Sequence, residues 1–379
     1  MLKIPSISTS TAHWERATII PAGGTGTGHA TNDGIKGGSS SALSEMLYAY
    51  DVGEDPPYLT CEAIKNKRFY ELLCHNLELP AYMGLSENLT TKDLDEIVDR
   101  IREELEYHDC PEVFVITSGT DAMEQVAKYV NDKLGDLIRA KGVKVILTGA
   151  NRDLTKPDTD IWDNLEFAFE SGFREDIISG VYVAFHNRLI PAELVAKEPF
   201  NGIEMNYISK KDPKYWSAVL KSNLSDINII RKLWWKLGIR DKAARSVATY
   251  PVNVIRENHK FVRGYVNSNS IRAVLFTLYH SSTANTIDDD NVSVAKLVSD
   301  FEDDGVLTFA VTENGEPVNL TPTAYETSVK LGKAGLRGLN MTRNVALAKL
   351  WMTACGSNNQ IVERMQTDFV GEMGPKHFV

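Results

Sequence analysis

Two threonine-bearing turns, each placed directly after an apolar run, constrain this 379-residue chain more than any other feature. The first turn, residues 22–28, follows the run 17–20, and the second turn, residues 118–124, follows the run 113–117. Both runs are rich in β-branched residues, which indicates buried strands of a parallel sheet. Open α/β sheets bind their ligands at the carboxyl ends of the strands. We therefore expect an α/β fold in which both turns lie in one crevice.

The residues in these turns include side chains that can take part in catalysis. The first turn contains Thr25, and the second contains Thr120 next to Asp121. Two hydroxyls and a carboxylate at neighbouring strand ends can supply a nucleophile and a base, and the starts of the following helices supply N–H donors for an oxyanion. A Thr-Asp pair at a helix start is, taken alone, usually only a cap. The combination of the two turns indicates catalysis.

Both turns resemble signatures of one enzyme family. Residues 22–27 resemble the first signature of the bacterial-type asparaginases, usually T-G-G-T-I-A, and residues 118–124 resemble the second, usually H-G-T-D-T-M-E. Residues 143–152, 324–335 and 340–350 are similar to later family segments and occur in the same order. The resemblance implies a larger N-terminal domain with a mostly parallel sheet and a smaller C-terminal α/β domain.

The resemblance also implies roles for individual residues. It assigns catalysis to four positions: Thr25, Thr120, Asp121 and Lys197. Thr25 would be the primary nucleophile, and the other three would form a relay in which a desolvated lysine with a lowered pKa acts as a base. It assigns substrate binding to five further positions: Ser86, Glu87, Gly24, Gly119 and Thr283. Ser86 would bind a carboxylate and Glu87 an ammonium group.

Four positions depart from the family pattern. They are Ser118, Ala122, Thr283 and Asn344, where the family usually has histidine, threonine, asparagine and an acidic residue. In the family, the C-terminal positions complete the pocket of a neighbouring subunit, so we expect a homodimer or a homotetramer. We also expect a small amino-acid-like substrate that keeps the amino-acid head of L-asparagine and differs from it at the far end.

Three classes of function remain open at this point. The first is hydrolysis of L-asparagine or a related small amide to the acid and ammonia. The second is lyase or transferase chemistry on a larger or modified amide with the same threonines. The third is a non-catalytic protein that binds a small molecule. Retention of all four catalytic positions favours an enzyme, because binding alone does not require them.

Composition excludes several partners. The net charge of −10 argues against nucleic acid, which needs a basic surface, and the longest apolar runs are too short to span a membrane. We expect a cytoplasmic protein. The glycines around Thr25 lack the spacing of a dinucleotide-binding turn or a P-loop, so no cofactor is expected. His29, His186 and His280 lack metal-ligand spacing, so no metal is expected either.

The order of segments predicts the domain organisation. Residues 1–207 form the N-terminal catalytic domain, residues 208–269 an irregular connecting segment, and residues 270–379 the C-terminal domain. The polar and glycine-rich residues 31–41 follow the first turn, and we expect them to form a lid. Trp234 and Trp235 of the connecting segment are expected to be buried at a domain or subunit contact.

Overall fold

The computed structural model describes most of the chain. The described residues are 16–23, 29–31, 34–36, 84–107, 110–152, 156, 158–198, 206–237, 246–252, 259–322, 324–371 and 373. Gly24 and Thr25 lie outside these ranges, as does much of the segment predicted to form a lid.

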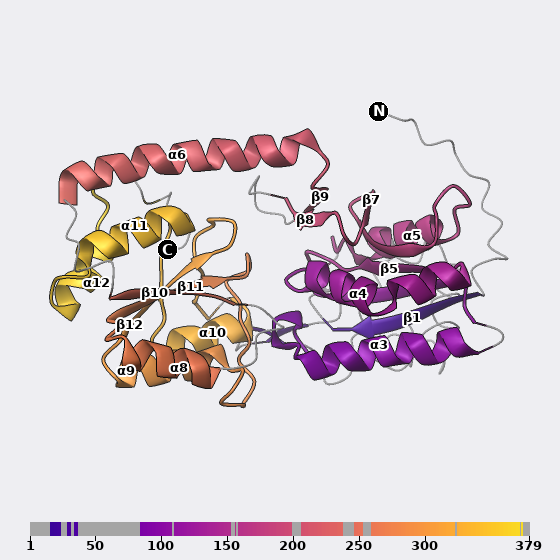
Figure 1. Cartoon of the computed structure of the whole chain (residues 1–379), viewed down its shortest axis with the longest axis horizontal. Helices are drawn as coiled ribbons and strands as arrows, with labels where there is room; N and C mark the ends of the chain where they lie inside the picture. The colour runs from indigo at the N-terminus through magenta and orange to yellow at the C-terminus, as the bar shows by residue number, and fades with distance from the viewer. Residues whose placement is uncertain are drawn as a thin grey trace.

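The first sheet has the strand order β1-β4-β5-β6-β7 (Figure 1). Its strands are β1 (Ala17–Ala22), β4 (Val113–Ser118), β5 (Lys144–Thr148), β6 (Gly180–Phe185) and β7 (Arg188–Pro191). The first four are parallel, and β7 returns antiparallel to β6. His186 and Asn187 make this return at positive φ angles of 46° and 58°. The predicted buried strands at 17–20 and 113–117 are confirmed, and they pair directly with each other.

The second sheet has the order β10-β11-β12-β13, and all of its pairings are parallel. Its strands are β10 (Val247–Pro251), β11 (Ala273–Leu278), β12 (Leu307–Thr312) and β13 (Arg337–Gly338). The predicted α/β class with parallel sheets is therefore confirmed. This sheet begins earlier than expected, because β10 lies inside the segment that we predicted to be a connection.

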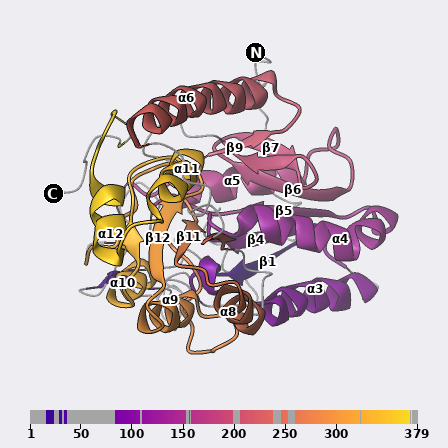
Figure 2. The same cartoon turned by 60° about the vertical axis from the view of Figure 1, so that its left-hand side comes forward.

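Helices cover both faces of each sheet (Figure 2). They are α3 (Thr91–Glu106), α4 (Met123–Lys141), α5 (Ile161–Gly172), α6 (Pro213–Leu237), α8 (His259–Ser268), α9 (Val294–Asp303), α10 (Glu326–Lys333), α11 (Arg343–Thr353) and α12 (Asn358–Gln366). Successive residues of a strand point to opposite faces. Ile20 therefore packs with α3 and α4, whereas Ile19 packs with α5. None of the described helices has both the length and the apolar character needed to cross a membrane.

Helix α3 shows why the sequence pattern was readable. Leu94, Ile97, Val98 and Ile101 recur at helical spacing and are all buried. The Thr90 hydroxyl caps the helix, because it accepts a hydrogen bond from the backbone N–H of Asp93. This cap orients the preceding turn, η4 (Ser86–Asn88), which contains two of the predicted substrate-binding residues.

Helix α6 corrects the expectation of an irregular connection. It is continuous over 25 residues and packs on α11 (Figure 1). Leu233 points into the core of the second sheet and is fully buried. Trp234 and Trp235 are 54% and 87% exposed, so they are not buried at a contact between the domains, and burial at a subunit contact stays a prediction. The helical period explains this result, because adjacent residues lie on different faces of a helix.

Two short antiparallel pairs complete the described strands. The first joins β2 (His29–Thr31) to β3 (Gly34–Lys36), which lies close to α10 and includes part of the segment predicted to form a lid. The second joins β8 (Val195–Lys197) to β9 (Tyr207–Ser209). Lys197 is the last residue of β8 and packs near the start of α4.

Close packing at the carboxyl ends of β4 and β5 gives a test of the fold. A Cβ atom added at Gly149 would lie 2.2 Å from the carbonyl oxygen of Ser118. We expect Gly149→Ala to lower the free energy of unfolding by about 3 kcal/mol, because the backbone must shift to relieve the overlap. Urea denaturation would measure the effect.

Gly264→Ala is the matched control. Gly264 lies in α8 with no atom near the added Cβ, so this variant should raise the free energy of unfolding by about 0.5–1 kcal/mol. Equal effects of the two substitutions would contradict the packing described for the ends of β4 and β5.

Candidate functional site

Asp121 is the centre of the polar contacts between the two sheets. It follows the end of β4 and is only 5% exposed. The hydroxyl of Thr283 donates a hydrogen bond to Asp121 Oδ2. His280 Nδ1 lies 2.7 Å from Asp121 Oδ1, and Lys197 Nζ lies 3.6 Å from the same oxygen. Burial acts to raise the pKa of Asp121, but His280, Lys197 and Thr283 outweigh burial and hold this pKa well below its usual range.

Lys197 is held on several sides. Its side chain is 14% exposed, and Nζ forms an ion pair with Glu313, which follows the end of β12. The backbone N–H of Lys197 donates to Glu124 Oε2 over 3.2 Å, and Nζ lies 5.1 Å from the centre of the Tyr279 ring. Burial acts to lower the pKa of Lys197, but Glu313 and Asp121 outweigh burial, so this pKa is raised. The expectation of a lysine with a lowered pKa is therefore wrong in this structure.

Thr120 lies in a turn that is fixed by its backbone. The hydroxyl of Tyr207 donates a hydrogen bond of 2.7 Å to the carbonyl oxygen of Thr120. The carbonyl oxygen of Gly119 accepts from the N–H groups of Ala122 and Met123 and so starts α4. The partners of the Asp121 side chain, Lys197 and His280, lie outside this helix. An acidic residue that serves only as a cap would instead accept from the N–H groups of the helix itself. Thr120 itself is 5% exposed.

Glu87 is the second buried carboxyl group of the site. It lies on η4 and is 3% exposed, and its Oε1 accepts a hydrogen bond of 2.7 Å from Thr327. Burial and the negative charge of Asp121 raise the pKa of Glu87 to about 8. The neighbouring Ser86 is 2% exposed, and Asn88 Oδ1 accepts from the backbone N–H of Thr286 over 2.8 Å. Turn η4 is therefore attached at two points to the segments that surround the second sheet, at Thr327 of α10 and at Thr286 in the loop before α9.

A small cavity lies beside Glu87. Its polar lining includes Glu87, Tyr250, His259 and Tyr279, and its apolar walls include Leu89. The cavity is about the size of one water molecule. His259 is fully buried, and burial together with Arg263 lowers the pKa of His259 to about 4, so its ring is neutral near pH 7.

Among the described residues, one group has the geometry of a metal site. Asp121, His280 and Glu313 each offer one ligand atom, and these atoms lie within 4.8 Å of one another. Oxygen and imidazole ligands of this kind suit divalent ions. The ammonium group of Lys197 already pairs with Glu313 and lies near Asp121, so a positive charge is present at this position. Inspection of histidine spacing missed this group because its members are distant in the sequence.

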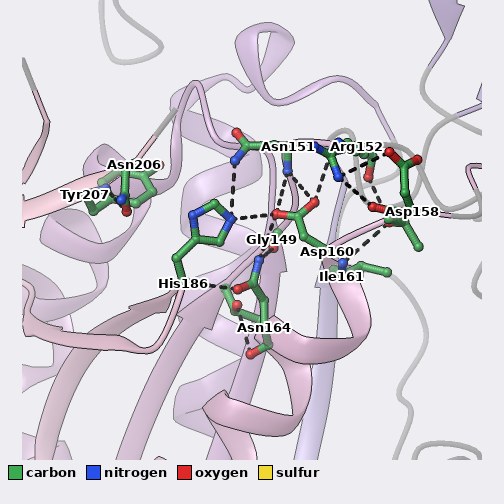
Figure 3. A network of polar contacts seen from close by, with 12 residues as sticks. Gly149, Asn151, Arg152, Asp158, Asp160, Ile161, Asn164, His186, Asn206 and Tyr207 are labelled. Carbon is green, nitrogen blue, oxygen red and sulfur yellow. Dashed lines mark hydrogen bonds and ion pairs between the residues drawn. The ribbon is translucent and has the colours of Figure 1, made fainter. Parts of the chain in front are cut away.

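A separate polar network lies after β5 and β6 (Figure 3). Asp160 Oδ2 lies 3.0 Å from His186 Nε2, and Asp160 Oδ1 accepts from the backbone N–H groups of Asn151 and Arg152. Asn164 adds a hydrogen bond to Asp160 and another to the carbonyl oxygen of Gly149. Burial acts to raise the pKa of Asp160, but these hydrogen bonds lower it overall. Both carboxylate oxygens are used within the protein, so this network orders the loop after β5.

The structure brings together several predicted site residues. Lys197 and Thr283 both contact Asp121, and Thr120 precedes Asp121 in the chain. Glu87 lies close enough for the charge of Asp121 to shift its pKa. Sequence reasoning missed three residues that contact this group: His280, Glu313 and Thr327. His280 and Glu313 each lie in the turn after a strand end, but their partners are distant in the sequence.

Asn344 makes a side-chain contact within its own chain. The expectation that it completes the pocket of a neighbouring subunit stays a prediction. The Asn344 side chain donates a hydrogen bond of 3.0 Å to Asp226 of α6, and Thr342 donates another of 2.7 Å to the same carboxylate. Asp226 is 3% exposed. An acidic residue at position 344 would place a second negative charge against this buried carboxylate, which is costly. The asparagine therefore serves the packing of α11 on α6.

Residues 18–205 match the family model described as "Asparaginase, N-terminal". The resemblance predicted from the two turns is confirmed over this range. Among curated proteins, none matches the chain.

The solved structures that are similar to this chain include the following three. The thermostable L-asparaginase from Thermococcus kodakarensis is 17% identical with a TM-score of 0.36, and the match covers 95% of this chain and 99% of that one. L-asparaginase I from Vibrio cholerae is 19% identical with a TM-score of 0.36 and the same two coverages, 95% and 99%. A probable cytoplasmic L-asparaginase from Campylobacter jejuni is 14% identical with a TM-score of 0.36, covering 92% of this chain and 98% of that one.

The raised pKa of Glu87 predicts a pH-dependent stability. The folded protein binds the Glu87 proton more tightly than the unfolded chain, so the free energy of unfolding falls as the pH rises from 4.5 to about 8. Glu87→Gln should remove this decline, because the amide is neutral at every pH and still accepts from Thr327. We expect the difference in the free energy of unfolding between the two proteins to change by about 5 kcal/mol across this range.

Urea denaturation of both proteins at several pH values would measure this change. Glu326→Gln is a suitable control, since Glu326 pairs with Lys330 on the same helix as Thr327. Parallel stability curves for wild type and Glu87→Gln would show that Glu87 titrates normally.

Proposed function

Because this chain belongs to the asparaginase family over residues 18–205, we propose that it is an amidohydrolase that hydrolyses the side-chain amide of a small amino-acid-like substrate. The observation that carries the proposal is the contact between Asp121 and Lys197 at the end of β4, beside Thr120. A buried carboxylate and ammonium next to a hydroxyl form a unit that can move a proton. They lie at the carboxyl end of a parallel sheet, where such folds bind ligands.

In the proposed mechanism, the hydroxyl oxygen of Thr25 attacks the amide carbon of the substrate. Its proton passes to the leaving nitrogen, and ammonia departs. Water then hydrolyses the acyl-enzyme, which releases the acid and restores the Thr25 hydroxyl. Thr25 and Gly24 lie outside the described residues, so their parts in this mechanism are predictions from the sequence. Backbone N–H groups of the two turns, near Gly24 and Gly119, would stabilise the oxyanion.

Thr120, Asp121 and Lys197 would activate the nucleophile or the water. Lys197 must lose a proton to act as a base, and its raised pKa means that this occurs at alkaline pH. Asp121 fixes the ammonium group, and Thr283 and His280 fix Asp121. We therefore propose an enzyme whose activity increases toward alkaline pH.

Ser86 and Glu87 would bind the amino-acid head of the substrate. At pH 7 most of Glu87 is protonated, and a bound ammonium group would favour its ionised form, because an opposite charge stabilises a carboxylate. Substrate binding would then release a proton from Glu87. Gly119 and Thr283 would also bind the substrate, and Thr283 already donates to Asp121.

The raised pKa of Lys197 also favours a second candidate, a non-catalytic relative that binds a small molecule. A lysine that keeps its proton near pH 7 could bind the carboxylate of a ligand without acting as a base. Lyase or transferase chemistry on a modified amide is a further alternative that rests on the sequence alone. Assembly as a homodimer or homotetramer and a cytoplasmic location remain predictions.

The first test is the release of ammonia from small amides. We expect Thr120→Ala and Thr25→Ala to lower kcat by several orders of magnitude without loss of the fold, because groups that act as a unit in catalysis fail together. Thr367→Ala is a control, since Thr367 is an exposed residue at the end of α12. Retention of more than about a tenth of the wild-type kcat by either variant would contradict the assignment of that threonine. Ligand-induced stabilisation without any ammonia release would instead favour the binding protein.

The second test concerns specificity. We expect kcat/KM for L-asparagine to be below about 10⁴ M⁻¹s⁻¹, because Thr283 and Asn344 differ from the family and both are engaged within this chain. Amino-acid amides with longer or substituted side chains should be better substrates, since the amino-acid head is retained and the far end differs. Steady-state kinetics on a matched set of amides would measure this. A higher kcat/KM for L-asparagine than for every other amide in the set would refute the expectation.

A further inference from the structure

Glu313 links the second sheet to the β8–β9 pair at the proposed relay. It follows β12, and the oxygen atom Oε1 has two partners that belong to different parts of the fold. The Lys197 ammonium, at the end of β8, forms an ion pair with Oε1. The backbone N–H of His280, in the turn after β11, donates to the same oxygen over 3.2 Å. His280 in turn contacts Asp121. The Glu313 carboxylate therefore holds both Lys197 and His280, the two residues that lie next to Asp121 Oδ1.

We propose that Glu313 is a positioning residue for Lys197, which holds the lysine ammonium against Asp121 and thereby sets the pH at which the relay becomes active. This inference rests on the proposed role of Lys197 as a base. Glu313 is not expected to touch the substrate, and it acts only through the lysine.

The charged groups around Lys197 support this role. Asp121 after β4 and Glu124 at the start of α4 are both negative neighbours of the ammonium, and Glu313 is the closest. His280 and the Tyr279 ring from the turn after β11, and Tyr207 from β9, complete the surroundings. Glu313 and Asp121 raise the pKa of Lys197 against the effect of burial. Removal of the Glu313 charge should therefore allow the lysine to lose its proton at a lower pH.

An ordinary surface ion pair would have little effect. Such pairs contribute about 0–1 kcal/mol because water screens both charges. The Glu313 side chain is 35% exposed, but that of Lys197 is only 14% exposed, so the lysine has few water molecules to replace a lost partner. The expected effect is thus on the protonation of Lys197 more than on the stability of the fold.

The test compares Glu313→Gln with wild type by two measurements. The first is the rate at which an amine-reactive reagent modifies Lys197 as a function of pH, followed by peptide mass spectrometry. The second is the pH profile of ammonia release. Glutamine keeps an acceptor for the His280 N–H and loses the charge. We expect both the modification of Lys197 and the rising limb of activity to shift to lower pH by about 1–3 units.

Two further variants control the result. Glu313→Asp keeps the charge on a shorter side chain, so its shift should be in the same direction and smaller; it also carries the test if Glu313→Gln does not fold. Glu198→Gln removes a carboxylate next to Lys197 in the chain that pairs with Arg188 instead, and we expect it to leave both profiles in place.

The outcomes separate this inference from the proposed function. If Lys197 in Glu313→Gln titrates as in wild type, or if Glu198→Gln causes an equal shift, Glu313 does not position the lysine and the inference is wrong. If the modification profile shifts while no variant and no wild-type sample releases ammonia, Glu313 has the role proposed here and the amidohydrolase assignment fails.

Discussion

The Asp121 carboxylate is bound from both sheets, and this arrangement determines how the site is built. β4 delivers the carboxylate, and the turn after β11 delivers Thr283 and His280 to its two oxygens. A buried charge without partners is very costly, so the second sheet must lie against the first for Asp121 to remain ionised. The position of the second sheet is therefore part of the chemistry of the site.

The buried charges of the site compensate one another. Asp121 stays ionised beside Lys197, and Glu87 reduces the total negative charge by keeping its proton to about pH 8. Both effects have the same origin, because one negative charge lowers the ionisation of its acidic neighbour and is itself stabilised by a nearby cation. Such divergent pKa values of neighbouring groups are frequent at functional sites, although ion pairs with a structural role also produce them.

Local sequence pattern predicted what depends on local interactions. The strands at 17–20 and 113–117 and the helix with Leu94 and Ile97 were readable, because the periodic burial of apolar residues determines them. The contact of His280 with Asp121 and that of Glu313 with Lys197 were not readable from the sequence, because each joins residues more than 100 positions apart. The pKa of Lys197 is raised and not lowered because of the same long-range contact with Glu313. Helix α6 was missed because the basic and aromatic stretch between Pro213 and Pro251 was interpreted as an irregular connection, although Pro213 is the first residue of the helix.

The attachment of η4 to the segments that surround the second sheet has a consequence for local opening. Glu87 and Asn88 are tied to Thr327 and Thr286 by single hydrogen bonds, and Asp121 is tied to the turn after β11 in a similar way. Each sheet has its own apolar cores on its two faces, so either can persist when these few polar links break. Opening between the sheets therefore requires less free energy than global unfolding. We therefore expect the site to open as a unit and its amide protons to exchange before those of the hydrogen-bonded strands around it.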